Sequence, residues 1–178
     1  MADEVAYIDM GLGKILAEIE KARVASIQVG LVGEKAETPT SDGRLTLAEA
    51  GVINEFGSSD GHVPRRSFLR DPIHREEPLV IAELAQAAHD IALLRATAEV
   101  AYDKVGRRMA LVVADAIVDG IPPANADATV EKKGFDEPLI DTGDMLAAVG
   151  HRVVRGTGDV LEGGSSAGEY EAFEVGGG

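Results

Sequence analysis

Apolar side chains along the first third of the chain follow helical and strand periods in turn. Between residues 8 and 23 they recur at steps of three and four, with charged residues between them, which predicts an amphipathic helix. From Ala25 to Val32 they alternate with polar and small residues, the period of a half-buried strand. After a polar connection, Thr46 and Glu49 fit a capping box and open a short helix that ends at Gly57.

The longest helical patterns lie in the middle of the chain. They run from Pro78 to about Ala98 and from Glu99 to Asp119. No glycine or proline separates them, so the spacing permits either one bent helix or a helical hairpin. The sequence Gly-Ile-Pro-Pro at 120–123 ends the second pattern, because proline lacks a backbone donor and disfavours a helical residue before it.

Two short elements are predicted near the C-terminal end. Residues 138–148 form a turn that leads into a helix of one or two turns, with Asp141 or Thr142 as its cap. Residues 151–155 form a short strand. Residues 156–178 are rich in glycine but also carry apolar side chains, so this tail is either loosely attached or a late strand pair that finds its partner outside the domain.

Length and composition favour one domain. A chain of 178 residues that is 45% apolar buries one sizeable core, which we assign to residues 1–155, followed by a Gly-rich acidic tail at 156–178. Only 4% of residues are aromatic, so the core is built from aliphatic side chains. The predicted fold class is α+β, with a small antiparallel sheet packed against an N-terminal helix and two long central helices, connected by long loops.

Charge and cysteine content narrow the classes of partner. With 31 acidic and 17 basic side chains, the net charge of −14 argues against attraction to nucleic acid or to an anionic membrane. The chain has no cysteine, which removes disulfides and thiolate sites. The N-terminus is acidic where a signal peptide is basic, and the longest apolar run is too short to span a bilayer. We expect no membrane span.

The stretch LIDTGDM at 139–145 is the strongest candidate for catalysis. Asp141, Thr142 and Gly143 between apolar residues resemble the way retroviral-type aspartic proteases present their catalytic carboxylate. Those proteases are almost entirely β, whereas the residues around this motif have a helical pattern. An N-cap, with the Asp141 or Thr142 oxygen accepting from backbone N–H groups, is the alternative that we favour.

Neither a metal site nor a cofactor site is expected. The four histidines, His62, His74, His89 and His151, are scattered and lack the spacing of a metal-binding helix. The segment GLGK at 11–14 lacks the glycine spacing and the Ser or Thr of a phosphate-binding loop.

The segment VPRRSFLRDP at 63–72 is unusually basic for this acidic chain. It is either a basic binding patch or a locally salt-bridged anchor, and the acids that flank it favour the anchor. In that interpretation Phe68 and Leu69 pin the loop to an apolar surface while the guanidinium groups pair with carboxylates of this or a neighbouring subunit. We expect Phe68, Arg65 and Arg66 to form an intersubunit anchor.

Four motifs in order resemble tailed-phage neck and tail-completion proteins, the HK97 gp10-like or virion morphogenesis families. They are Glu55-Phe56-Gly57, Val63-Pro64-Arg65-Arg66-Ser67-Phe68-Leu69, Pro122-Pro123 and 138–146, PLIDTGDML. The resemblance covers roughly residues 50–148. One departure is that family members commonly read Arg-Pro-Phe where this chain has Arg66-Ser67-Phe68.

The resemblance implies structural roles for three groups of residues. The short helix is closed by Glu55, Phe56 and Gly57. The anchored loop is formed by Pro64, Arg65, Phe68 and Leu69, together with Arg66. The second turn is formed by Leu139, Asp141, Thr142 and Gly143.

The resemblance also implies a function. It predicts a non-enzymatic virion protein, made in the host cytoplasm, that forms or joins a sixfold or twelvefold ring at the head–tail junction or upper tail. Its partners would be copies of itself and neighbouring connector, tail-terminator or tail-tube proteins, and DNA would pass through without sequence-specific binding. The alternatives are a regulatory protein-binding module with an Arg-rich loop and an aspartic protease that uses Asp141.

Overall fold

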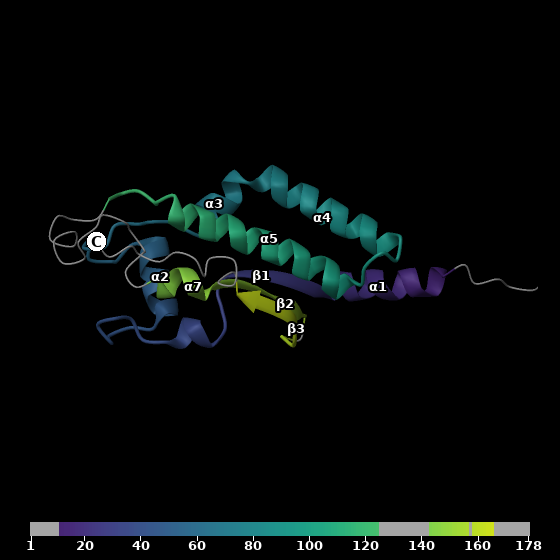
Figure 1. The fold of residues 1–178 in the computed structure, drawn as a ribbon, viewed down its shortest axis with the longest axis horizontal. Helices are drawn as coiled ribbons and strands as arrows, with labels where there is room; N and C mark the ends of the chain where they lie inside the picture. Colours follow the sequence, from purple (N-terminus) through teal and green to yellow (C-terminus); the bar gives the residue numbers. More distant parts are fainter. Residues whose placement is uncertain (1–10, 125–142, 157, 166–178) are drawn as a thin grey trace, which may run out of the picture.

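A computed structural model of the chain describes residues 11–124, 143–156 and 158–165 (Figure 1). The described elements are α1 (Leu12–Val24), β1 (Ala25–Leu31), η1 (Glu34–Glu37), α2 (Leu47–Phe56), α3 (Arg70–Arg75), α4 (Glu77–Ala92), α5 (Ala98–Val118), α7 (Asp144–Ala148), β2 (Val149–Arg155) and β3 (Val160–Ser165). They begin with one helix and one strand, are helical from η1 to α7, and end with two strands.

The strands form one antiparallel sheet in the order β1-β2-β3. β1 pairs with β2 along its whole length, from Ala25 opposite Arg155 to Leu31 opposite Val149. The sheet therefore joins two ends of the chain that are more than a hundred residues apart in sequence. The predicted α+β class with a small antiparallel sheet is confirmed.

Helix α5 covers one face of this sheet and contacts all three strands. Its small residues Ala110 and Ala114 let the helix approach closely, and with Val113 and Ile117 they pack around Phe68 and Val149 in a fully buried cluster. Bulky aliphatic residues on the strands fill the space between the layers, as expected for a core with few aromatics.

Helices α4 and α5 form a hairpin, which resolves the choice that the periodicity left open. The chain turns through Leu94, whose φ of 53° is the left-handed conformation that ends a helix, and α5 restarts with the Thr97 hydroxyl accepting from Val100 N–H. In Figure 1 α4 lies on the far side of α5 from β3. A second buried cluster, which includes Ala87, Ile91 and Val105, holds the two helices together.

Most predicted elements lie where the pattern indicates. Both hydrogen bonds of the capping box are present, since the side chain of Thr46 accepts from the Glu49 N–H and the side chain of Glu49 accepts from the Thr46 N–H. The chain leaves α2 through Gly57 at a φ of 81°. Helix α3 was not predicted as a separate element. Its six residues are too few to show a helical period.

The start of the tail follows neither of the two alternatives that the sequence left open. It is not loosely attached and does not pair outside the domain, because β3 pairs with β2 of the same chain from Gly150 opposite Ser165 to Val154 opposite Val160. The sequence did not predict this strand, because the glycines at 163 and 164 interrupt the alternation of apolar and polar residues. Residues 166–178 lie outside the described part of the chain.

Candidate functional site

The carboxylate of Glu55 at the end of α2 is the centre of a hydrogen-bonded cluster. It is buried and accepts from the Ser67 hydroxyl at 2.7 Å, the Leu69 backbone N–H at 3.0 Å and Arg70 Nε at 2.8 Å. Ser67 and Leu69 lie in the loop that leads into α3, and Arg70 is the first residue of that helix. Because a buried charge is tolerated only when it is paired and hydrogen-bonded, Glu55 fixes this loop against the end of α2.

The position of Glu55 follows from helix geometry. Leu47, Gly51 and Glu55 are four residues apart and form the buried face of α2. Gly51 lets the Leu31 and Phe68 side chains pack close to α2, because a Cβ there would collide with the terminal methyl of Leu31 and would lie 3.5 Å from the Phe68 ring. The close approach at Gly51 brings the loop within reach of the Glu55 carboxylate.

The surroundings of Glu55 favour its ionised form. Burial alone would raise the pKa of Glu55, but the hydrogen bonds from Arg70, Ser67 and the backbone N–H groups of Leu69 and Arg70 outweigh it and hold the pKa below its ordinary value. A carboxylate with a lowered pKa is a poor general acid at neutral pH. The ionised carboxylate is therefore suited to holding the loop through its hydrogen bonds.

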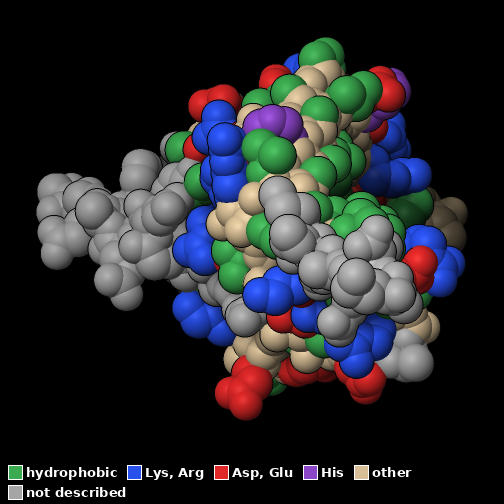
Figure 2. All heavy atoms as spheres, turned by 90° about the vertical axis from the view of Figure 1, so that its right-hand side faces the viewer, with side chains coloured by type: hydrophobic (Ala, Val, Ile, Leu, Met, Phe, Trp, Pro, Cys, Tyr) green, Lys and Arg blue, Asp and Glu red, His purple; other side chains and the backbone are tan. Residues whose placement is uncertain are grey.

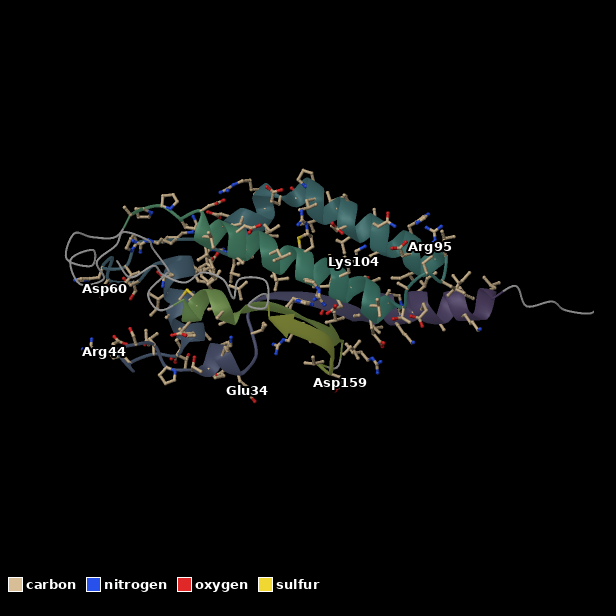
Figure 3. The ribbon with its side chains drawn as sticks, viewed as in Figure 1. Glu34, Arg44, Asp60, Arg95, Lys104 and Asp159 are labelled. Atoms are coloured by element: carbon tan, nitrogen blue, oxygen red, sulfur yellow. The ribbon has the colours of Figure 1, made fainter. Side chains whose placement is uncertain are left out.

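The three arginines of the loop are engaged within the chain. Arg66 is buried and donates to the carbonyl oxygens of Pro123 at 2.8 Å and Ala124 at 2.9 Å, just beyond the end of α5. Arg65 pairs with Asp71 at 2.7 Å. Arg70, besides its bond to Glu55, lies 4.4 Å over the ring of Phe56, whose side chain is exposed. Figure 3 shows the side chains around these elements.

The prediction that Phe68 anchors a neighbouring subunit is wrong. Its side chain has no exposed area and is the largest fully buried residue of the core cluster with Val113, Ile117 and Val149. Leu69 is half-buried and also packs against this cluster. The loop is a clasp that inserts an aromatic ring into the protein's own core. Pro64, which the resemblance assigns to the same loop, is exposed.

Ser67 gives a physical reason for the departure from Arg-Pro-Phe. Its hydroxyl donates to Glu55 and accepts from the Asp71 backbone N–H at 3.2 Å, in the first turn of α3. A proline at this position would supply neither bond. In this chain the serine therefore takes part in the cluster that starts α3.

The second predicted turn is described only at its end. Leu139, Asp141 and Thr142 lie outside the described residues, while Gly143 is the N-cap of α7 at a φ of 81°. The predicted caps, Asp141 and Thr142, are therefore outside the described residues, and the residue at the N-cap position of α7, which begins at Asp144, is Gly143.

One buried polar pair was missed at the sequence level. His151 on β2 is 3% exposed, and its Nε2 lies 2.7 Å from Asp103 Oδ1 on α5, while Arg107 bonds the other oxygen of Asp103 at 3.0 Å. The His151 ring fills the space left by Gly106. The sequence did carry a signal for its burial, because His151 is two residues from both Val149 and Val153 and so lies on the same face of the strand. The pair therefore joins helix α5 to strand β2.

Other kinds of site are not found in the described part of the chain. No three His, Asp or Glu side chains within residues 11–124, 143–156 and 158–165 converge as metal ligands. The charged residues labelled in Figure 3 project from separate elements and do not meet in a cleft. Among the helices described, none has both the length and the apolar character needed to cross a membrane.

A largely apolar groove of about 400 Å³ lies between β1, α4 and α5. This β1-edge groove is lined chiefly by aliphatic side chains. They include Ile27, Val29, Val80, Leu84, Val105 and Met109. Its polar lining is sparse, and the hydroxyl of Tyr102 at one side bonds the Ala22 carbonyl at 3.3 Å. The groove therefore lacks the convergent polar groups that orient a small ligand.

Comparisons with family models, with curated proteins and with solved structures found no match to this chain.

Proposed function

We propose that this chain is a structural protein of a tailed-phage particle, acting at the head–tail junction or upper tail. It forms or joins a ring that connects neighbouring rings and leaves a channel for DNA. Its partners are further copies of itself and the adjacent neck or tail proteins, and it has no catalytic role.

The Glu55 cluster is the observation that carries this proposal. The resemblance rests on motifs that are separate in sequence, and two of them, Glu55-Phe56-Gly57 and the loop from Pro64 to Leu69, meet at one buried carboxylate. Pro123, from a third motif, accepts from Arg66. Motifs that form one hydrogen-bonded unit are a more specific basis for a family resemblance than isolated short strings.

The charge of the chain agrees with a role beside a DNA channel. A subunit with a net charge of −14 repels phosphate and would not retain the passing polymer. The internal engagement of Arg65, Arg66 and Arg70 favours the structural role over the regulatory binding module, because those guanidinium groups already have partners within the chain. The ring interface must then use other surfaces.

The assembly state of the purified full-length chain tests the ring. Sedimentation velocity should give a discrete oligomer, and negative-stain images should show rings with a central opening. Antibody against the chain should label intact particles at the head–tail junction or upper tail. A chain that stays monomeric at all concentrations, together with particles that carry no label, would contradict the proposal.

A further inference from the structure

The outer edge of β1 is open. From Ser26 to Leu31, the backbone hydrogen bonds run only to β2 within the described residues. An edge strand offers unpaired N–H and C=O groups that can pair with another strand. Ser26 and Gln28 are exposed on the face of β1 that points away from α5, so no described helix covers this edge from below.

Helix α4 extends beyond this edge. On α5, the residues that face the sheet core (Ala110, Val113, Ile117) and those that face α4 (Ala101, Val105) lie about a third of a turn apart. α4 therefore lies beside α5 and does not stack on top of it. Its position on the β1 side is fixed by the β1-edge groove, which residues of β1 and α4 line together.

The spacing of the layers leaves one strand position empty beneath α4. α5 contacts all three strands and is centred on the middle one, β2. Packed helices lie about 8–10 Å apart and paired strands about 4.7–4.9 Å apart. A strand added next to β1 would lie two strand spacings from β2 and would thus be covered by α4, with Val80 and Leu84 above it.

The same spacing determines what can enter. If the sheet edge of another complete domain paired with β1, the helix above that sheet would lie closer to α4 than two helices can pack. The position therefore admits a lone extended segment without helices of its own. Such a segment needs two apolar side chains at i and i+2 to enter the groove, while its backbone pairs with β1.

Residues 169–175, Glu-Tyr-Glu-Ala-Phe-Glu-Val, have this pattern. Phe173 and Val175 share one face of an extended strand. Glu171, on the same face, would lie at an open end of the groove. Ala172 and Glu174 fall on the opposite face, beside the exposed polar side chains of Gln28 and Arg152.

The direct path from the end of β3 to the groove of the same domain is obstructed. Four residue steps from Ser165 to Glu169 span about 13–14 Å when fully extended, which leaves no slack for a detour. The empty position is three strand spacings from β3, about 14–15 Å, and the direct path is blocked by the connections that enter β2 and leave β1, where Val32 N–H bonds the Ala148 carbonyl. A second copy presents the same groove without this obstruction, and we therefore take it as the acceptor.

We propose that residues 169–175 of one copy add as a fourth strand to the open edge of β1 in a neighbouring copy, with Phe173 and Val175 in the β1-edge groove. This deepens the proposed function, because it rests on self-association and names the contact that joins subunits. The contact is heterologous, so repeating it generates a ring when the rotation closes.

Full-length variants test the contact on both sides. Leu84→Asp alters the groove, and Phe173→Asp alters the inserted segment. Each should weaken self-association in sedimentation velocity by about tenfold or more, as loss of a central apolar anchor does. Ile81→Asp is the matched control. Ile81 lies on the same helix and is 61% exposed, but it does not line the groove, so the association constant should change less than twofold. Circular dichroism would verify that each variant is folded.

A peptide titration tests the acceptor separately from the ring. A fluorescent peptide of residues 168–178 should bind the full-length Phe173→Asp chain, whose own segment no longer competes, and should not bind the Leu84→Asp/Phe173→Asp double variant. The same peptide with Phe173→Asp should not bind either chain.

The outcomes separate the two proposals. An oligomer that persists unchanged in Phe173→Asp, or a peptide that fails to bind, overturns the strand exchange and leaves the ring standing. Displacement of subunits by a peptide of residues 2–10 instead of 168–178 overturns it as well, since another segment then occupies the edge. A wild-type chain that is monomeric overturns the strand exchange between copies, even if it binds the peptide.

Discussion

Replacement of Glu55 by glutamine removes the charge from the most connected buried group and keeps its shape. In the native protein the carboxylate accepts from Ser67, Leu69 and Arg70, and its side chain is only 4% exposed. A glutamine keeps one acceptor oxygen, which can still serve the Leu69 N–H. Its NH₂ group replaces the other oxygen and faces Arg70, which is itself a donor.

The cost can be worked out bond by bond. Hydrogen bonds to a charged group contribute roughly 1.5–3 kcal/mol and neutral ones roughly 0.5–1.5 kcal/mol, so each converted bond loses about 1 kcal/mol. Arg70 is 57% exposed and can be rehydrated, which limits its share. We expect Glu55→Gln to lower the free energy of unfolding by about 2–3 kcal/mol at neutral pH. Glu55→Ala, which leaves buried donors without acceptors, should cost more.

The effect should also depend on pH. Because the folded-state pKa of Glu55 lies below its unfolded value, the ionised carboxylate contributes stability above the unfolded pKa of about 4.3, and that contribution is lost as the pH falls through the folded pKa. The difference between wild type and Glu55→Gln should therefore be largest near pH 7 and should shrink as the pH falls through the unfolded and then the folded pKa.

Urea unfolding followed by circular dichroism at several pH values measures this difference. Glu34→Gln is the matched control, since Glu34 is exposed on η1 and points outward in Figure 3, and it should change stability by less than about 0.5 kcal/mol. If Glu55→Gln is as stable as Glu34→Gln at pH 7, or if its deficit does not shrink on acidification, the ionised carboxylate does not hold the loop.

Two further substitutions test the core. Phe68→Ala should lower the free energy of unfolding by about 3–5 kcal/mol in urea, because the ring is fully buried; a folded, equally stable variant with impaired assembly would instead restore the intersubunit anchor. Gly106→Ala should destabilise the protein by about 1–3 kcal/mol in thermal unfolding, although alanine is the better helix former. The reason is that its Cβ would collide with the His151 ring and lie 3.0 Å from Ile27 Cγ2. A rise in melting temperature would instead show that α5 and the sheet can move apart without loss of stability.

The surface also carries apolar side chains that no described element covers. Leu12 and Leu16 on α1 and Leu93 and Leu94 in the α4–α5 connection are each more than a third exposed. Figure 2, which views this end of the molecule, shows hydrophobic atoms at the surface among charged ones. Uncovered apolar residues of this kind are common at surfaces that contact other chains.

Local patterns in the sequence determined most of the elements by themselves. Helical and strand periods report which face of an element is apolar, and capping depends on residues three positions apart, so α5, β1 and the capping box of Thr46 and Glu49 could be predicted without any tertiary information. Strand β3 could not, because its glycines carry no period, and its place in the sheet comes from pairing with β2.

What each polar or aromatic residue contacts was decided only by the tertiary structure. An Arg-rich loop with one phenylalanine has the composition of an interface, but the close approach of α2 at Gly51 turns Phe68 into the core and brings Glu55 over the loop. The pairing of His151 with Asp103 depends on the packing of β2 against α5, between residues 48 positions apart. Composition and period carry no information on such distant contacts, because the free energy of burying a ring or a charge depends on the surface it meets.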